Sequence, residues 1–313
     1  MTKDAKNVFD YSGKKKIWFL ISLALIAVII VVTIIKGVEV AIEFKGGTII
    51  SYSYEGDAQV TDVQKDIEDL LNTPVTIQEG ENLASSSNSV SISFSYDQGL
   101  TADKQNSLTE LLQEKFPDNK FEILDSNDVN PTSGKEFLTK CIIASALAAI
   151  LIIVYIGFRF KQISGWSAGV CAVLALIHNL IFVFGTFVVM GYEINANFIA
   201  VILTILGYSV NDTIVVYDRI RENTGLMPKA SVAEIVNIST SQSMRRSLRT
   251  SITTISTMVI VSIVASVYHV NSILSFSIPM IIGRAAGTYA SLYIASPLWV
   301  WWNERKSSKK SKK

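Results

Sequence analysis

The sequence predicts an α-helical membrane protein with six transmembrane helices and one folded domain outside the bilayer. Three observations favour this fold class. Of the 313 residues, 49% are hydrophobic, and the mean hydropathy is positive at +0.36. Six apolar runs are long enough to cross a hydrocarbon core of about 30 Å at about 1.5 Å per residue. A polar stretch, residues 36–135, separates the first run from the second.

The six runs are apolar and contain few charges. The predicted spans are 17–35, 136–158, 166–190, 195–217, 250–268 and 273–302. Lysines at 14–16 precede the first run, as they would in a secretory signal. The apolar core of this run is longer than the roughly 7–15 residues of a signal peptide, and no small-x-small cleavage site follows. It is therefore predicted to be an uncleaved anchor.

Lysine and arginine residues gather at one set of helix ends. They flank the predicted spans at positions 14–16, 159, 161, 219, 221, 245, 246 and 249, and they recur from 305 to the C-terminus. The two short connections on the other side, 191–195 and 269–272, carry none. The positive-inside rule then predicts a multi-pass protein of the cell membrane, with residues 1–16 and 303–313 in the cytoplasm and residues 36–135 outside. The basic tail is interpreted as a topology-setting segment, with ribosomal RNA or anionic lipid as alternative ligands.

The stretch 36–135 has the pattern of a folded α+β domain. Its segments follow the order β-α-β-β-α-β, which is typical of a ferredoxin-like fold. The expected strands are 48–54, 74–78, 90–94 and 121–124, and the expected helices are 59–72 and 104–116. The serine-rich residues 79–88 are predicted to form a mobile hairpin loop. Between Gly37 and Gly134 there are 18 acidic and 5 basic side chains, a net charge of −13, which disfavours nucleic acid and suits a basic or unfolded partner.

The chain lacks the residue patterns of enzymes and metalloproteins. Cys141 and Cys171 both fall inside predicted spans, where a structural disulfide is not expected, and no metal-ligand spacing occurs. There is no phosphate-binding glycine loop and no Ser-His-Asp arrangement. We therefore expect no enzymatic activity, no metal and no cofactor. An ion gradient is the natural energy source, because one elementary charge crossing the membrane is worth about 2.3 kcal/mol per 100 mV.

Asp212 is the most informative single residue, because it lies inside the apolar run of the fourth span. A carboxylate at membrane depth costs at least about 2.5–3.5 kcal/mol, and such residues usually face a protein interior or a water-filled path and act there. The sequence therefore predicts an ion or proton site at Asp212. The alternative is a structural polar contact between helices.

The neighbours of Asp212 suggest how such a site could work. Tyr208 lies one turn earlier on the same helical stripe, with Asn211 and Gly207 beside it. The fifth span begins at a similar depth with Arg246, and hydroxyl side chains follow at helical spacing: Thr250, Thr253, Thr254 and Thr257. The favoured hypothesis pairs Asp212 with Arg246, so that protonation of the carboxylate breaks the pair. The threonines alone are better explained by hydrogen bonds to backbone or to a neighbouring helix.

Other residues in the spans carry weaker signals. His178 and Asn179 lie midway along the third span, where they could join a proton relay or serve packing. Arg284 lies inside the sixth span and needs an acidic or carbonyl partner, or must extend to the membrane surface. Gly283 and Gly287 form a G-x-x-x-G step, which is typical of close helix packing.

Four motifs resemble the SecF family of protein-export membrane subunits, within the resistance-nodulation-division superfamily. The longest is GYSVNDTIVVYDRIREN at 207–223 in the fourth span. IEFKGGT at 42–48 resembles the family's motif after the first span and contains Phe44, Gly46, Gly47 and Thr48. RSLRTSITT at 246–254 resembles the start of its fifth span, and GTYASLYIAS at 287–296 resembles part of its sixth. The resemblance covers essentially the whole chain.

The resemblance implies a role in protein export. Family members pair with SecD and use the proton gradient, or in some lineages a sodium gradient, to complete the translocation of unfolded preproteins that emerge from the SecYEG channel. YajC and YidC are further candidate partners, as is membrane lipid. The family's essential aspartate corresponds to Asp212, and its fifth-span arginine to Arg246, not Arg249. The sequence departs from the family at Asn179, where an aspartate is expected, and at Arg284, which has no assigned role.

Two other functions remain open. A subunit that exports lipids or small molecules within the same superfamily would need a larger outer domain with an apolar cleft. A scaffold subunit that links the Sec channel to membrane-insertion factors would tolerate loss of the Asp212 charge.

Overall fold

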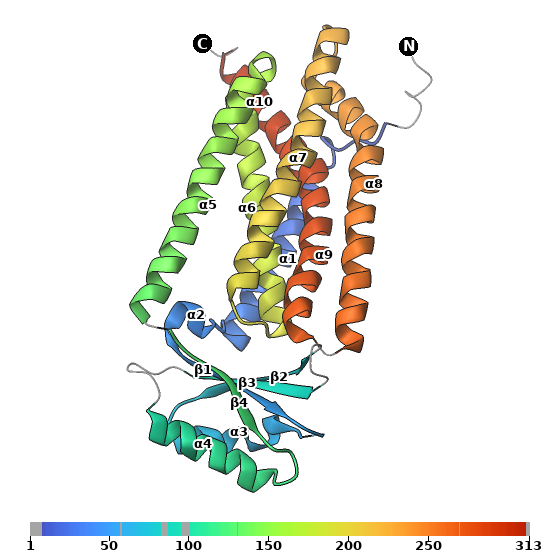
Figure 1. Cartoon of the computed structure of the whole chain (residues 1–313). Helices are drawn as coiled ribbons and strands as arrows, with labels where there is room; N and C mark the ends of the chain where they lie inside the picture. The colour runs from blue at the N-terminus through green and yellow to red at the C-terminus, as the bar shows by residue number, and fades with distance from the viewer. Residues whose placement is uncertain are drawn as a thin grey trace.

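The computed structural model describes residues 8–56, 58–82, 87–94, 101–129, 131–268 and 270–310. Long helices form a bundle, and a small sheet with its own helices lies at one end of it (Figure 1). At the other end, Lys15 in the first helix pairs with Glu304 in the last, with 3.1 Å between Nζ and Oε2. Both ends of the described chain therefore lie away from the sheet (Figure 1).

Among the described residues, five helices are long and apolar enough to cross a membrane. They are α1 Lys15–Lys36, α5 Pro131–Arg159, α6 Gly165–Met190, α7 Ala196–Leu226 and α8 Val232–Val267. Their length and composition agree with the predicted helical membrane protein. Cys141 and Cys171, in α5 and α6, are free thiols.

Two of these helices are longer than their predicted spans. The prediction ended the fourth span at residue 217 and began the fifth at 250, whereas α7 continues to Leu226 and α8 begins at Val232. Ser231 caps α8, because its Oγ accepts a hydrogen bond from Glu234 N at 3.2 Å. Ile220 and Ile235 are both buried in one apolar cluster, so the polar ends of the two helices pack on each other. Hydropathy marks the part of a helix that suits the membrane, and here the helices continue beyond it.

The predicted sixth span, 273–302, is not one regular helix. Helix α9, Asn271–Tyr289, passes into a π-helical segment, Ala290–Ala295, and then into α10, Ser296–Lys310. Pro297 has no N–H to donate and its ring would collide with the carbonyl four residues earlier, so the regular hydrogen-bond ladder cannot pass through it. A π turn directly before the proline accommodates this interruption.

The part of the chain between α1 and α5 forms a four-stranded antiparallel sheet. The strands are β1 Gly47–Tyr54, β2 Val75–Asn82, β3 Ser87–Phe94 and β4 Glu122–Val129, in the spatial order β2-β3-β1-β4. The 3₁₀ turn Val60–Val63 leads into α3, Gln64–Leu71, and α4 is Ala102–Lys115. Both helices lie on the sheet face that points away from the bundle (Figure 1). Ile50, Ile92 and Leu108 are fully buried between the sheet and these helices.

The predicted mobile loop at 79–88 is shorter than expected. β2 runs to Asn82 and β3 starts at Ser87, and these two residues are paired across the hairpin. Backbone pairing along a neighbouring strand stabilises this segment in spite of its polar composition. Residues 83–86 lie outside the described residues.

Candidate ion-coupling site

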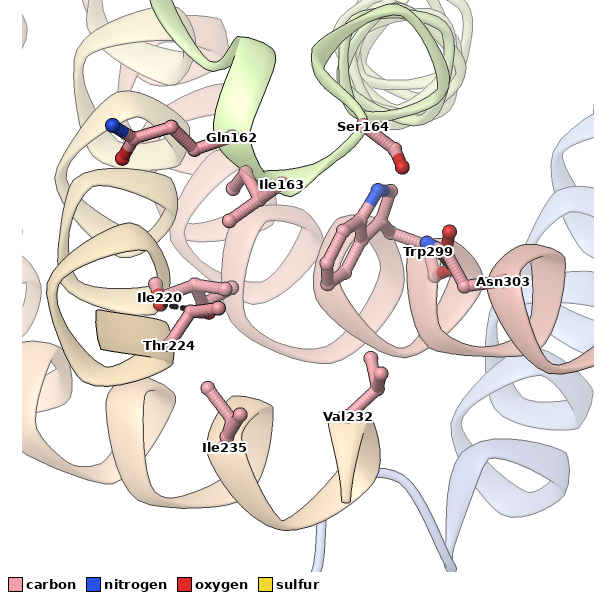
Figure 2. Close-up of a pocket in the computed structure, with 9 residues that line it drawn as sticks. All are labelled: Gln162, Ile163, Ser164, Ile220, Thr224, Val232, Ile235, Trp299 and Asn303. Carbon is pink, nitrogen blue, oxygen red and sulfur yellow. Dashed lines mark hydrogen bonds between the residues drawn. The ribbon is translucent and has the colours of Figure 1, made fainter. Parts of the chain in front are cut away.

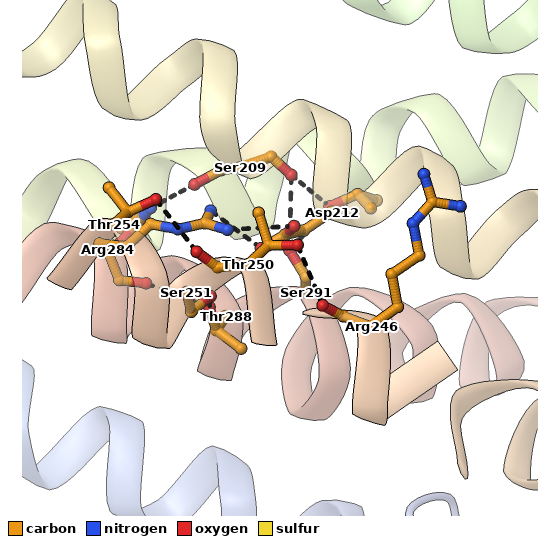
Figure 3. A network of polar contacts seen from close by, with 11 residues as sticks. Ser209, Asp212, Arg246, Thr250, Ser251, Thr254, Arg284, Thr288 and Ser291 are labelled. Carbon is orange, nitrogen blue, oxygen red and sulfur yellow. Dashed lines mark hydrogen bonds and ion pairs between the residues drawn. The ribbon is translucent and has the colours of Figure 1, made fainter. Parts of the chain in front are cut away.

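Asp212 forms a buried ion pair with Arg284 of α9. Arg284 Nη1 lies 2.9 Å from Asp212 Oδ2, and Arg284 Nη2 donates a hydrogen bond to Asp212 Oδ1 at 3.3 Å. The Arg284 and Asp212 side chains are only 1% and 3% exposed. Figure 3 shows the two groups facing each other. Charges this deeply buried persist only when paired, and removing one partner leaves the other uncompensated. The pair therefore links α7 and α9 through two mutually dependent charges.

The ion pair predicted between Asp212 and Arg246 is not the one that forms. Arg246 is exposed on α8, and Figure 3 shows its guanidinium standing apart from the Asp212–Arg284 pair. Arg284 lies between Gly283 and Gly287, on the face of α9 that packs against α6 and α7. Arg284, and not Arg246, is therefore the cation that pairs with the buried Asp212 carboxylate.

The pair is incompletely hydrogen-bonded. Among the described residues, Asp212 Oδ2 and Arg284 Nε and Nη1 have no hydrogen-bond partner, although Nη1 and Oδ2 form the 2.9 Å ionic contact. The guanidinium carbon of Arg284 lies 5.1 Å from the centre of the Tyr208 ring, within the range of a cation–π contact. Unsatisfied buried polar atoms are costly. A water molecule at this pair could donate to Asp212 Oδ2 and accept from Arg284 Nε or Nη1, which would relieve that cost.

Small polar side chains near the pair form hydrogen bonds that join α6, α7, α8, α9 and the π segment. Asn179 of α6 donates to Ser209 of α7 at 2.6 Å, and Thr213 of α7 bonds Ser291 of the π segment at 3.0 Å. Thr288 of α9 bonds Ser251 of α8. All of these contacts are buried, so the ion pair lies within a polar layer, of which Figure 3 shows Ser209, Ser251, Thr288 and Ser291.

His178 and Asn179, the two candidate relay residues of the third span, have different surroundings in the structure. Asn179 joins this polar layer, but its neighbour His178 packs on Phe182, with ring centres 4.8 Å apart, and on Tyr289 at 6.0 Å. His178 is 7% exposed, and neither ring nitrogen has a partner within the described parts of the chain. The arrangement places Asn179, rather than His178, against Ser209 and the glycine face of α9.

The remaining predicted polar residues lie on the exposed sides of α7 and α8. Thr250 and Thr253 are exposed, and each donates to the carbonyl four residues earlier, at 3.0 and 2.9 Å. Asn211 and Gly207 are also exposed. A Cβ at Gly207 would meet no heavy atom of the described residues within 4 Å, so this glycine does not pack closely inside the chain.

Gly283 and Gly287, by contrast, allow close approach. A Cβ at Gly283 would lie 2.8 Å from Val183 Cγ2, and one at Gly287 would lie 2.6 Å from Ser209 Oγ and 2.7 Å from Asn179 Nδ2. The glycine face of α9 therefore fixes how near the polar groups of α6 and α7 come to Arg284.

The motif after the first span lies where the sheet joins the bundle. Phe44, in the short helix α2 Ile42–Lys45, is 3% exposed and packs in the bundle. Gly46 and Gly47 have φ values of +84° and +146°, a region that side-chain-bearing residues rarely adopt. Thr48 is buried at the start of β1 and donates to Asp128 Oδ1 at 2.5 Å.

Glu193, in the connection between α6 and α7, is half-buried at the same junction. Burial raises the pKa of its carboxyl above the usual range. The neighbouring carboxylates of Glu39 and Glu43 raise this pKa further, while Thr76 and Lys45 oppose the rise. The pKa of this carboxyl is higher in the folded protein than in the unfolded chain, so the protonated form favours folding. This contribution to stability is fully present below the unfolded pKa, and it is lost as pH rises through the folded pKa.

Glu193→Gln is therefore expected to raise the Tm at pH 7.5 by roughly 1–3 °C, because the amide removes a buried charge and its repulsion by Glu39. The difference should vanish near pH 4, where the native carboxyl is protonated. Thermal unfolding of the detergent-solubilised protein at both pH values measures it, with Glu110→Gln, on the exposed face of α4, as the matched control. An equal difference at both pH values would contradict the assignment.

A separate cavity of about 190 Å³ lies at the end of the bundle away from the sheet. Figure 2 shows the nine side chains that line it. It lies between the 3₁₀ turn Lys161–Ile163, α7, α8 and α10. Its lining is apolar or uncharged: Gln162, Ile163, Ser164, Ile220, Thr224, Val232, Ile235, Trp299 and Asn303. None of these nine residues has a side chain that titrates near neutral pH, so the cavity is not suited to bind a proton.

The fold and the site define a helical membrane protein with a buried carboxylate–guanidinium pair between two of its long helices. Residues 108–305 match the family described as Protein export membrane protein SecD/SecF, C-terminal. The chain belongs to the SecD/SecF family.

Relatives and solved structures extend this similarity over nearly the whole chain. The chain is 32% identical over 292 residues to Protein translocase subunit SecF of Petrotoga mobilis, covering 92% of this chain and 94% of that one. It is 32% identical over 306 residues to Protein translocase subunit SecDF of Bacillus subtilis, covering 97% of this chain and 39% of that one. The crystal structure of SecDF, a translocon-associated membrane protein from Thermus thermophilus, superposes with a TM-score of 0.78 at 29% identity, covering 97% of this chain and 40% of that one. The chain thus spans almost a whole SecF and about two fifths of a SecDF.

Proposed function

We propose that the protein is a SecF-type subunit that, together with SecD, uses the proton or sodium gradient to drive late steps of preprotein translocation across the cytoplasmic membrane. Family membership and the SecF and SecDF relatives support the Sec export role. The observation that carries the ion coupling is the Asp212–Arg284 pair, buried between two helices of the bundle.

Protonation of Asp212 would remove the charge that compensates Arg284. A buried guanidinium without its partner costs several kcal/mol, so α9 would shift against α7 until the cation found another acceptor. The Thr288–Ser251 bond would transmit this shift to α8. Proton binding would then favour one of two helix arrangements, and the outer domain would hold and release the exported chain in step.

The other candidate residues are assigned supporting roles in this site. Arg246 is a second cation, within electrostatic range of Asp212 from the exposed side of α8. The remaining candidates would line or extend the proton path: Tyr208, Asn211, Thr250, Thr253, His178 and Asn179. A sodium ion would use the same carboxylate, with neighbouring hydroxyl and amide oxygens as ligands.

The proposed topology has six spans. The α9–π–α10 segment serves as the sixth, although it is interrupted. Both termini are assigned to the cytoplasm, because the connections on that side carry the basic residues. The sheet and its two helices form an extracytoplasmic ferredoxin-like domain, since their order along the chain and in space suits that fold.

SecD is the proposed principal partner, because the relatives include SecDF proteins in which this chain matches about two fifths of the length. Polar side chains on a membrane-facing helix surface are unfavourable in lipid. The exposed Asn211, Thr250 and Thr253 are therefore assigned to the SecD contact. SecYEG, YajC and YidC, unfolded preproteins and membrane lipid complete the proposed partners, and nucleic acid is not among them.

The test is preprotein translocation into inverted vesicles from cells depleted of this subunit. The vesicles are reconstituted with native protein or Asp212→Asn, with and without an imposed proton gradient after nucleotide removal. The gradient-driven phase is expected to be lost in Asp212→Asn alone, and repeating the assay with a sodium gradient identifies the coupling ion. Glu136→Gln removes one exposed carboxylate at the start of α5 and serves as the control. An intact gradient-driven phase in Asp212→Asn would leave the scaffold function as the better account.

A further inference from the structure

The segment that joins α1 to the outer sheet is built into the bundle along most of its length. Ile194 N, in the connection before α7, donates to Glu39 O at 2.8 Å, and Ala41 N donates to Ile194 O at 3.1 Å. These two bonds form a short parallel bridge between Val40 and Ile194. The chain is therefore held against the α6–α7 connection before it reaches α2.

Helix α2 is wedged into the end of the bundle through Phe44. Its ring stacks on Phe137 of α5, with ring centres 5.7 Å apart and planes inclined by 15°. The same ring belongs to an apolar cluster with Val183 of α6 and Val201 of α7. A Cβ at Gly134 of α5 would lie 2.8 Å from Glu43 O and 2.9 Å from Phe44 O. The backbones of α2 and α5 are thus in contact, and there is no space for a side chain between them.

Glu43 attaches α2 to the helix that carries Asp212. Its Oε2 accepts a hydrogen bond from Ala196 N at 2.9 Å. Ala196 is the first residue of α7, where backbone N–H groups lack partners within the helix and the helix dipole attracts negative charge. Displacement of the start of α7 would therefore pull directly on α2.

On its other side, α2 leads into the centre of the outer sheet. β1 starts two residues after Lys45, the last residue of α2, and pairs with β3 on one edge and with β4 on the other. Gly46 is the one residue between α2 and β1, Gly47 begins β1, and the buried Thr48 then ties β1 to β4 through Asp128. Any displacement of α2 is thus applied to a central strand, and not to a flexible tether.

We propose that α2 is a rigid coupling element that transmits movement of α7 to the outer sheet, with Phe44 as its anchor in the bundle and Glu43 as its attachment to α7. This inference rests on the proposed function, because it takes the movement of α7 to follow from protonation of Asp212. It assigns to Phe44, Glu43 and Gly134 a positioning role in coupling, and not a role in ion binding.

The experiment uses the full chain assembled with SecD in vesicles. Spin labels at Asp69 on α3 and Val267 at the end of α8 report the distance between the outer domain and the bundle, in a Cys141→Ala/Cys171→Ala background. Phe44→Ala is expected to broaden the distance distribution and to abolish the gradient-driven phase of translocation. Protonation of Asp212, followed by the infrared carboxyl band, should remain. Phe44→Leu should restore translocation, and Phe158→Ala, at an exposed site on α5, should behave like the native protein.

Two further variants test the contacts one by one. Glu43→Ala removes the bond to Ala196, and Gly134→Ala drives a methyl group against the backbone of α2. Each should weaken the gradient-driven phase with the infrared band unchanged. Suppose that Asp212→Asn is defective but Phe44→Ala keeps the native distance distribution or the native gradient-driven phase. This result would overturn the coupling role of α2 and leave the proposed function intact. A normal gradient-driven phase in Asp212→Asn would overturn the proposed function instead.

Discussion

Arg284→Met is expected to destabilise the protein by about 3–5 kcal/mol, because the substitution leaves Asp212 buried and unpaired. Methionine fills a similar volume, so the loss would reflect the uncompensated charge and not a cavity. Asp212→Leu should also destabilise the protein, because it leaves Arg284 buried and unpaired. The double variant Arg284→Met/Asp212→Leu should recover most of the lost stability, since neither charge then remains.

Denaturant unfolding of the three variants and the native protein in mixed micelles measures this cycle. A coupling energy of several kcal/mol between the two sites is the expected result. Additive effects would mean that the two charges do not depend on each other in the folded protein. The double variant should still lack gradient-driven translocation, because the group that would take up the proton is gone.

Gly287→Ala is expected to cost about 1–3 kcal/mol and to impair translocation. Its Cβ would lie 2.6 Å from Ser209 Oγ and 2.7 Å from Asn179 Nδ2, which are themselves hydrogen-bonded. Relief of the overlap requires either loss of that bond or movement of α9 away from α6 and α7. Both changes would alter the surroundings of the Asp212–Arg284 pair.

Gly207→Ala is the matched control, since it adds the same methyl group where no heavy atom of the described residues lies within 4 Å. Thermal unfolding and translocation assays on both variants provide the comparison. Equal stability of the two would show that α9 is not closely packed at Gly287. A defect confined to Gly207→Ala in the assembled complex would instead locate a partner against this side of α7.

The long apolar helices could be predicted from hydropathy, because transfer into the membrane depends on composition over some 20 residues. The ends of the helices could not be predicted in this way. The segment 232–249 is too polar to be read as part of a span, yet it continues α8, because Ser231 caps it and Ile235 packs against Ile220. The π-helical segment before Pro297 could not be predicted either. The sequence there stays apolar, and hydropathy does not respond to a local change of backbone hydrogen bonding.

The burial of Asp212 against other helices could be expected from the sequence, because a lone carboxylate in an apolar run is too costly to face lipid. The partner of Asp212 could not be derived from spacing along one helix, since spacing does not tell which neighbouring helix faces it. Arg246 lies at a suitable depth, but its side chain is exposed. A usable signal did exist: Arg284 is a second charge within an apolar run, of opposite sign, and the nearby Gly283 and Gly287 mark a closely packed face of α9.

The uninterrupted length of α8 has a mechanical consequence. Its 36 residues extend over about 54 Å, well beyond an apolar core of about 30 Å. The portion 232–249 would project by about 27 Å at 1.5 Å per residue. A straight helix of this length converts a small rotation into a large displacement of its end. A tilt of about 10° near Ser251 would move the N-terminal end of α8 by roughly 5 Å. Small rearrangements around the buried charges would thus become visible at the far end of α8, where a fluorescent probe could follow them without disturbing the site.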